Sequence, residues 1–362
     1  MRVKLGDIFE IGSGGTPSKS CSEYYGGDIP WVKTGDLKSE YIYGVEDFIT
    51  EDGLGNSSAK MYEEDTVLIA MYGATIGATS ILKISACTNQ ACAAFKRSDK
   101  VIPEYLYYFL KSQKEKFVKD GVGGAQPNIS AGYLKKVEME LLSIREQRTI
   151  VDILNIIENI ANKRKQEIIA LDNLIKARFV EMFGDPIINS RHLETKDLKD
   201  VMLLKAGDFT VASDIADEQT ETNPYPCYGG NGIRGYVSEY NQEGDYSLVG
   251  RQGALSGNVQ YASGKFKNTE HALLVTPIVE MNSIWLHQLL LNLDLKRYQT
   301  GAAQPGLSVK NLQEIQVILA PIDEQNRFAE FVKRIDKSKV AVQKALDETQ
   351  LLFNSLMQKY FG

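Results

Sequence analysis

The sequence Ala125-Gln126-Pro127-Asn128-Ile129-Ser130 recurs 178 residues later as Ala303-Gln304-Pro305-Gly306-Leu307-Ser308. The same offset, without a gap, carries Phe183-Gly184 onto Phe361-Gly362. A gapless match over roughly sixty residues does not arise by chance, so the chain contains a tandem repeat. The upstream parts match only loosely, as in Tyr72-Gly73-Ala74-Thr75-Ile76-Gly77 against Gln252-Gly253-Ala254-Leu255-Ser256-Gly257. Each copy therefore joins a variable part to a nearly repeated tail.

The repeated tails are predicted to form long helices. Apolar residues recur at alternating steps of four and three from Ile150 to Met182, and again from Phe328 to Tyr360. This spacing is typical of a coiled-coil seam and predicts about four heptads in each copy. The principal apolar positions of the seam are Ile150, Leu154, Ile157, Ile168, Leu171 and Ile175, and then Phe328, Val332, Ile335, Leu346, Phe353 and Leu356.

Capping residues predict where these helices begin and end. Ser143-x-x-Glu146 is a capping-box pattern at the start of the first tail. In the second tail Pro321 stands in place of that serine, so Asp323 is the expected N-cap. Gly184 predicts the end of the first helix.

Two arrangements of the helices are open. A helix of about 38 residues would extend roughly 57 Å and could not bury its apolar stripe alone. Each helix could pack on its own domain, or the two could pair antiparallel as a rigid spacer about a pseudo-two-fold axis. We favour the antiparallel pair, because the obvious partner for each tail is its own repeat.

The variable parts are predicted to be mixed α/β domains. Short apolar runs at 66–71 and 272–276 indicate buried strands, and 104–119 and 283–292 have the character of helices. The expected fold class is α/β (α+β), with two globular domains separated by a pair of long antiparallel coiled-coil helices. The expected segments are 1–142 and 185–320 for the domains, with 143–184 and 321–362 for the helices.

Composition limits the class of protein. The chain has 362 residues, and its 41 Lys plus Arg against 47 Asp plus Glu give a net charge of −6. That balance argues against a wholly basic nucleic-acid coat, although a local DNA-binding face remains possible. Four cysteines without C-x-x-C spacing do not form a disulfide framework. Because no apolar run follows Met1 and none is long enough to span a membrane, we expect a cytoplasmic protein.

Catalytic motifs are not found in the sequence. The glycine-rich segment 12–20 has Ser18 where a Walker A loop needs glycine, so it is expected to be a surface loop. Asn223-Pro224-Tyr225-Pro226 resembles the adenine methyltransferase motif, but its second proline is displaced, and a turn is expected. The three histidines are scattered, without zinc-ligand spacing. The chain is therefore expected to be noncatalytic, with no metal site.

Local clusters of basic residues suggest contact with nucleic acid. Between Lys96 and Lys119 seven basic residues stand against three acidic ones, which fits either phosphate contacts or a solvated helix face. In the second copy arginine and glutamine, which read guanine and adenine edges, occur in loop-like sequence. The candidate DNA-binding residues are Lys19, Lys33, Tyr72, Asn89, Tyr228, Asn231, Arg234, Arg251, Gln252, Lys265 and Lys267.

Over nearly its whole length the chain resembles the specificity subunits of type I restriction–modification enzymes. Gly14-Gly15-Thr16-Pro17-Ser18, Gly27-Asp28-Ile29-Pro30-Trp31-Val32 and Tyr225-Pro226-Cys227-Tyr228-Gly229-Gly230-Asn231-Gly232 carry this resemblance. The order Gln-Pro-x-(Ile/Leu)-Ser, then Glu-Gln opening a long helix, also occurs twice.

The resemblance implies two target-recognition domains, each reading half of a split, asymmetric DNA sequence, with the helices setting the gap. It implies two modification subunits that methylate adenine with S-adenosylmethionine, restriction subunits that use ATP and Mg, and no cofactor on this chain. The alternatives are a self-contained methyltransferase or nuclease, and a protein-binding scaffold. Besides the seam residues given above, the residues expected to dock partners on the helices are Glu146, Gln147, Glu324 and Gln325.

Overall fold

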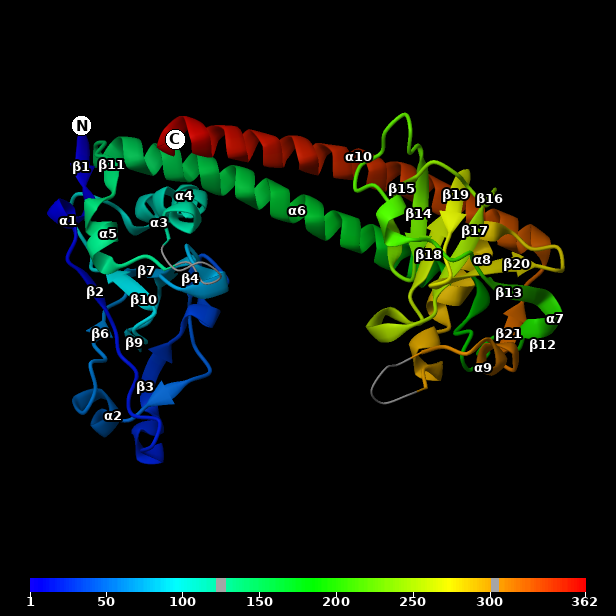
Figure 1. Cartoon of the computed structure of the whole chain (residues 1–362), viewed down its shortest axis with the longest axis horizontal. Helices are drawn as coiled ribbons and strands as arrows, with labels where there is room; N and C mark the ends of the chain where they lie inside the picture. The colour runs from blue at the N-terminus through cyan, green and yellow to red at the C-terminus, as the bar shows by residue number, and fades with distance from the viewer. Residues whose placement is uncertain (122–127, 301–305) are drawn as a thin grey trace. The chain divides into compact units, whose positions relative to one another are not determined.

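A computed structural model describes residues 1–121, 128–300 and 306–362. The chain divides into two compact units, and Figure 1 labels their elements in chain order. Unit 1 comprises Met1–Lys163 and Ala345–Gly362, and unit 2 comprises Arg164–Lys344. No helix in the described part of the chain is both long and apolar enough to cross a membrane.

Unit 1 is built on two mixed sheets. The larger has the order β2-β10-β7-β8-β4, the second β5-β3-β9-β6, and a short ladder pairs β1 with β11. The strands are β1 (Arg2–Lys4), β2 (Ile11–Ser13), β3 (Tyr25–Val32), β4 (Tyr41–Ile42), β5 (Phe48–Ile49), β6 (Met61–Tyr62), β7 (Val67–Ala70), β8 (Thr79–Leu82), β9 (Ala86–Thr88), β10 (Cys92–Phe95) and β11 (Glu138–Glu140). The short helices are α1 (Leu5–Ile8), α2 (Glu51–Gly55), α3 (Pro103–Ser112), α4 (Lys114–Asp120) and α5 (Ala131–Lys136).

Unit 2 repeats this plan. Its sheets have the orders β13-β20-β17-β18 and β15-β14-β19-β16, and β12 pairs with β21. The strands are β12 (Glu194–Asp197), β13 (Met202–Ala206), β14 (Tyr225–Gly229), β15 (Gly232–Val237), β16 (Gln242–Glu243), β17 (Tyr246–Gly250), β18 (Val259–Ala262), β19 (Lys265–Asn268), β20 (Ala272–Pro277) and β21 (Gln316–Leu319). The short helices are α7 (Leu198–Val201), α8 (Ser283–Asn292) and α9 (Val309–Gln313).

The two units share strand order and strand direction. In each unit one sheet contains a parallel pair, β3 with β9 or β14 with β19, and the other sheet begins with an antiparallel pair, β10 with β2 or β20 with β13. Unit 1 adds β4 at the edge of its larger sheet. The duplication therefore extends through the variable parts, where the sequences match only loosely.

The long helices are α6 (Ile144–Phe183) and α10 (Ile322–Phe361), each of 40 residues. In unit 1, Leu154 near the start of α6 shares a core with Met357 near the end of α10. In unit 2, Ile175 near the end of α6 shares a core with Phe328 near the start of α10. The helices therefore pair antiparallel, as predicted, and every seam position from Ile150 to Met182 is buried or half-buried.

Helix ends follow the predicted capping, with one exception. The amide of Ser143 donates to Oε2 of Glu146 at 2.9 Å, and the amide of Glu146 donates to Oγ of Ser143 at 3.3 Å, which completes the capping box. Gly184 ends α6 in the left-handed region, with φ of +77°. The expectation that Asp323 is an N-cap is wrong, because α10 already begins at Ile322 and Asp323 lies in its first turn.

The ends of the long helices also serve as pieces of the domain cores. Phe179 and Phe183 lie beside the seam, are fully buried, and pack against Trp285 of α8 and Phe328. Phe361 does the same in unit 1, where its ring packs against α3. Both arrangements considered from the sequence thus occur together, since each helix pairs with the other and also packs on a domain.

Candidate nucleic-acid interface

Two glycine-bounded turns occupy equivalent places in the units. In unit 1 the turn follows β7 and includes a 3₁₀ turn at Gly73–Thr75, and in unit 2 it follows β17 and includes one at Gly253–Leu255. Gly73 and Gly253 have φ of +66° and +73°, in the left-handed region that glycine adopts without strain. The loose sequence match between these segments therefore marks a close structural match.

The same hydrogen bonds hold both turns. The amide of Met71 donates to the carbonyl of Ala91 at 2.8 Å, and in unit 2 the amide of Arg251 donates to the carbonyl of His271 at 3.0 Å. On the other side, the carbonyl of Met71 accepts from Ile129 at 3.0 Å, and the carbonyl of Arg251 accepts from the amide of Leu307 at 2.9 Å. The turn is thereby joined to the repeated Gln-Pro-x-(Ile/Leu)-Ser segment, of which the residues preceding Asn128 and Gly306 lie outside the described residues.

Tyr72 and Gln252 project from these turns in the same backbone conformation. Their φ and ψ are −131° and 150° for Tyr72, and −132° and 153° for Gln252. Both side chains are exposed, and neither makes a hydrogen bond within the described part of the chain. The two turns thus share a backbone conformation, whereas the side chain presented to a ligand is a tyrosine in one and a glutamine in the other.

Of the three further predicted residues of unit 1, Asn89 is linked to this turn. Asn89 accepts a hydrogen bond at Oδ1 from the amide of Ala91, whose carbonyl holds the turn. Lys33 lies over the ring of Trp31 and is paired with Asp47, its Nζ 2.6 Å from the carboxylate. Lys19 is exposed and has no ion-pair partner among the described residues. These residues stay predictions as DNA contacts.

Segment 12–20 is only in part the surface loop that the sequence predicted, because residues 18–20 are exposed whereas Gly14, Gly15 and Pro17 are buried. Gly14 and Gly15 are buried, and a Cβ added to Gly14 would lie 1.7 Å from the carbonyl oxygen of Thr88. The amide of Gly15 donates to that carbonyl at 2.9 Å, and Nε1 of Trp31 donates to the carbonyl of Gly15 at 3.1 Å. Glycine is therefore required here for close packing against β9, rather than for binding a phosphate.

In unit 2 several predicted residues gather around the turn. Asn231 accepts at Oδ1 from Nδ2 of Asn258 at 2.8 Å, which joins the segment after β14 to the end of the turn. A Cβ added to Gly250 would lie 2.3 Å from the carbonyl of Gly230, so the two loops are in close contact. Asn231, Arg251 and Gln252 consequently belong to one surface.

Arg234 lies beside the same loop. Its aliphatic stem covers Gly229, where an added Cβ would lie 2.5 Å from Cδ of the arginine. The guanidinium groups of Arg234 and Arg251 have no hydrogen-bond or ion-pair partner in the described residues. An unpaired guanidinium beside a glycine-rich loop suits recognition of phosphate or guanine.

The remaining predicted residues of unit 2 are engaged elsewhere. Tyr228 packs its ring on Phe266 and is half-buried. Lys267 is paired with Asp208 at 3.7 Å, and Lys265 lies 4.0 Å from Glu243 and over the ring of Tyr240. These lysines are partly neutralised, so they offer less free charge than the two arginines.

The basic stretch between Lys96 and Lys119 does not form a single free face. Lys111 of α3 is half-buried and paired with Glu158 of α6 at 3.0 Å. Lys96 is paired with Glu10 at 2.8 Å. Two of the seven positive charges are thus neutralised within unit 1.

The side chains predicted to dock partners mostly face the chain itself. Gln147 and Gln325 are 0% and 1% exposed. The seam residues are buried or half-buried in the same way. The sequence analysis missed the exposed apolar residues of the two helices, which stand outside the seam: Ile156, Ile160, Ile169, Leu174, Val180, Val340, Leu351 and Leu352.

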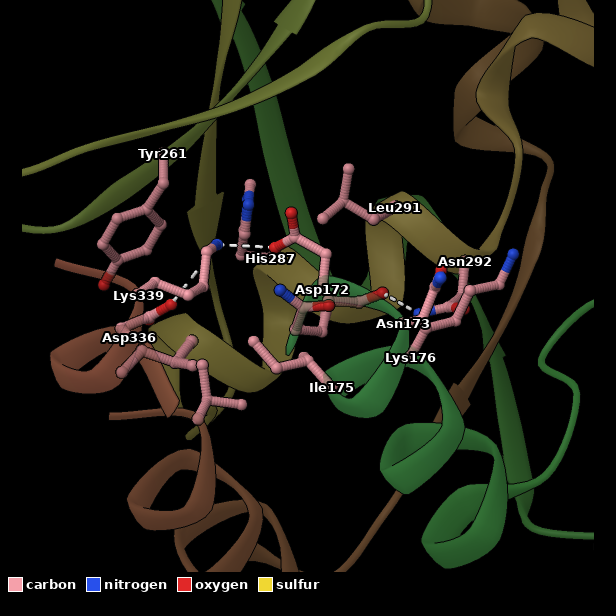
Figure 2. Close-up of a pocket in the computed structure, with 13 residues that line it drawn as sticks. Asp172, Asn173, Ile175, Lys176, Tyr261, His287, Leu291, Asn292, Asp336 and Lys339 are labelled. Atoms are coloured by element: carbon pink, nitrogen blue, oxygen red, sulfur yellow. Dashed lines mark hydrogen bonds and ion pairs between the residues drawn. The ribbon is translucent and has the colours of Figure 1, made fainter. Parts of the chain in front are cut away.

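A cavity that the sequence did not predict lies in unit 2 (Figure 2). It has a volume of about 510 Å³ and lies between α8, strand β18 and the parts of α6 and α10 that belong to this unit. Lys339 reaches across it to Asp172 at 2.5 Å, and His287 lines it beside Tyr261. Burial lowers the pKa of His287 to about 4, so the imidazole is neutral at neutral pH.

Among the residues that the structure describes, no group of three His, Cys, Asp or Glu side chains is placed to hold a metal ion. Two of the acidic side chains on α6 are paired with lysines, Glu158 with Lys111 and Asp172 with Lys339.

Comparison with known proteins agrees with this geometry. The family model described as the type I restriction modification DNA specificity domain matches residues 1–170 and 191–349. The chain is 30% identical over 350 residues to the type I restriction enzyme EcoprrI specificity subunit of Escherichia coli, covering 92% of this chain and 87% of that one. It is 34% identical over 230 residues to the MjaIX specificity subunit of Methanocaldococcus jannaschii, covering 61% and 52%.

Solved structures show the same fold. The S subunit of a type I restriction–modification system from M. genitalium matches with a TM-score of 0.59 at 18% identity, over 100% of this chain and 96% of that one. A chain from a type I system studied for complex assembly and conformational transition matches with a TM-score of 0.64 at 16% identity, over 100% and 97%. With both copies matched by one family model, the chain belongs to the family of type I restriction–modification DNA specificity proteins.

Proposed function

We propose that this chain is the sequence-reading subunit of a type I restriction–modification complex and that it recognises a bipartite, asymmetric DNA target. The observation that carries the proposal is the pair of equivalent turns. They share backbone geometry and hydrogen bonds, yet present tyrosine in unit 1 and glutamine in unit 2. Two readers of one architecture with different side chains would read two different half-sites.

The long helices are proposed to set the gap between the half-sites. Each has 40 residues, which corresponds to a length of about 60 Å at a rise of about 1.5 Å per residue. Each helix contributes one end to the core of unit 1 and the other to the core of unit 2. A continuous helix resists bending, so a pair of them is suited to hold two readers at one separation.

We assign the chemistry to partner subunits. The sequence lacks the loops that bind nucleotides and the motif of adenine methyltransferases. In this proposal two modification subunits hold S-adenosylmethionine and methylate adenine, and restriction subunits use ATP and Mg. The chain itself is noncatalytic, carries no cofactor, and acts on DNA in the cytoplasm.

The docking surface for the modification subunits is proposed to be the solvent-facing side of the long helices. Ile156 and Leu351 are 59% and 71% exposed, although they are large apolar residues on helices. Exposed apolar residues of this size are usual at protein interfaces. The seam residues, in contrast, are engaged within the chain.

Methylome sequencing tests the proposal. The chain is expressed with its modification subunit in a host that lacks other adenine methylation. We expect methylated adenines in one interrupted motif whose two halves differ. A palindromic motif would contradict the asymmetric reading, and the absence of any sequence-specific methylation or DNA footprint would contradict the function itself.

A further inference from the structure

Two buried glutamines occupy equivalent positions at the start of the long helices. Gln147 lies in the first turn of α6, and Gln325, 178 residues later, lies in the first turn of α10. Their side chains are 0% and 1% exposed. A buried primary amide must satisfy one acceptor and two donors, so its partners show what it holds together.

In unit 1 the amide of Gln147 joins three segments. Oε1 accepts from the amide of Ile102 at 3.0 Å, and Ile102 is the residue immediately before α3. Nε2 donates to the carbonyl of Lys100 at 2.8 Å and to the carbonyl of Leu142 at 2.9 Å. The side chain thereby ties the start of α6 to the start of the helix that packs on the larger sheet.

In unit 2 the amide of Gln325 makes two of these three contacts. Oε1 accepts from the amide of Asn282 at 2.9 Å, and Asn282 is the N-cap of α8. Nε2 donates to the carbonyl of Ala320 at 2.8 Å, which is the residue equivalent to Leu142. In both copies a glutamine side chain thus links the start of the long helix to the start of α3 or α8, although these two helices differ in sequence. We call this set of hydrogen bonds the glutamine joint.

No other standard side chain makes the hydrogen bonds of the glutamine joint as well as glutamine does. Glutamate has the reach but cannot donate to the two carbonyls when it is ionised, and asparagine is shorter by one methylene group. Alanine would leave the partner amide and carbonyl groups buried without hydrogen bonds. The joint is also rigid, because all the hydrogen bonds go to backbone groups on both sides of it.

We propose that Gln147 and Gln325 are positioning residues that fix the direction in which each long helix leaves its recognition domain, and so restrict the DNA target to one gap length. This inference rests on the proposed function. The glutamines do not touch the DNA, so they act on the spacing of the half-sites and not on the bases within them.

The test is the gap spectrum of methylation. The complex with its modification subunit is expressed with Gln147→Ala, with Gln325→Ala, or with the wild-type chain, and the methylome is sequenced. We expect sites whose gap is one base pair longer or shorter than the wild-type gap to gain methylation by roughly tenfold or more, because each variant loses at least two buried hydrogen bonds. The base preferences of both half-sites should be unchanged.

Two further variants keep the result interpretable. Gln219→Ala changes an exposed glutamine outside the long helices and should leave the gap spectrum as in the wild type. If the alanine variants do not accumulate, Gln147→Met and Gln325→Met fill nearly the same space without hydrogen-bonding groups or charge, and the same widening is expected.

The inference is overturned if variants that accumulate normally keep a single gap, since the glutamines would then only stabilise the fold. Altered base preferences in a half-site would also overturn it. Both outcomes differ from failure of the proposed function, in which the wild-type complex itself would methylate no interrupted target.

Discussion

The helix that follows β10 in unit 1, α3, and the helix that follows β20 in unit 2, α8, both pack against the long helices, but their polar side chains differ. In unit 1 α3 presents Tyr108 and Lys111, whose polar groups bind Asn155 and Glu158 of α6 at 2.6 and 3.0 Å. In unit 2 α8 presents a half-buried, neutral histidine, His287, beside a cavity (Figure 2). The backbone arrangement of these two helices is repeated while the side-chain contacts of α3 with α6 are not, so the arrangement does not depend on one particular set of side-chain hydrogen bonds.

The largest effect is expected at the aromatic ends of the long helices. Phe183→Ala in unit 2 should lower the free energy of unfolding by about 3–5 kcal/mol, and Phe361→Ala in unit 1 by a similar or smaller amount. Phe183 is 0% exposed and Phe361 is 8% exposed. Urea unfolding measures the loss, and hydrogen exchange identifies which unit has been loosened.

Leu351→Ala, at a side chain that is 71% exposed, serves as the control for these helix-end variants and should change stability little. If Phe361→Ala loosened unit 2 rather than unit 1, the assignment of helix ends to cores would be incorrect.

Acid should distinguish the two units. His287 has its pKa lowered to about 4 by burial, so below pH 6.5 the unfolded chain binds a proton that the folded chain does not. The contribution of His287 to the free energy of unfolding is therefore fully present above pH 6.5 and is lost towards pH 4. The loss amounts to about 2 kcal/mol at pH 5. Counted from the first residues of α3 and α8, Pro103 and Ser283, the position of His287 corresponds to Tyr107 in unit 1, and a tyrosine does not titrate in this range.

The measurement is urea unfolding of the wild type and of His287→Gln between pH 4.5 and 7.5. The variant should lose less stability on acidification than the wild type, by the amount attributed to the histidine. Equal pH profiles for both proteins would show that His287 is accessible to protons in the folded state.

A substitution in either of the two equivalent turns should affect recognition of only one half-site. Gln252→Ala should lose about 1–3 kcal/mol of discrimination at one base pair of the second half-site, and Tyr72→Ala a comparable amount in the first. Methylation rates on DNA with single base changes measure this. A uniform loss on all sequences, or a loss in the wrong half-site, would argue against equivalent reading positions.

Arg251→Ala removes a guanidinium without a partner in the described residues, and should cost about 1–3 kcal/mol at one base position if it reads a base.

The smallest effect is expected at Lys265, whose charge is already close to a carboxylate. Lys265→Ala removes an ammonium group near Glu243, and should only reduce the slope of log affinity against log salt by about one. A sequence-specific effect of Lys265→Ala would show that its side chain leaves Glu243 to contact a base.

Periodicity explains which parts of the fold were predictable. The seam and the ends of α6 follow from the spacing of apolar residues and from Ser143, Glu146 and Gly184, because these signals are local. The start of α10 does not follow from the sequence in the same way, because Pro321 precedes Ile322 and a proline has no side-chain group that caps a helix. Phe179 and Phe183 stand beside the seam at helical spacing, and two buried aromatic residues there could have indicated a second apolar face.

The sequence by itself determined the duplication, the long helices and the family, because these are recorded in spacing and in short repeated motifs. Only the tertiary structure decided that the variable parts share one topology, since strand order depends on pairings between distant segments. It also decided that Gly14 is buried, that Asn231 lies beside Gln252, and that Gln147 and Gln325 are enclosed. A residue's partners across the fold are set by packing, and composition and spacing along the chain do not record them.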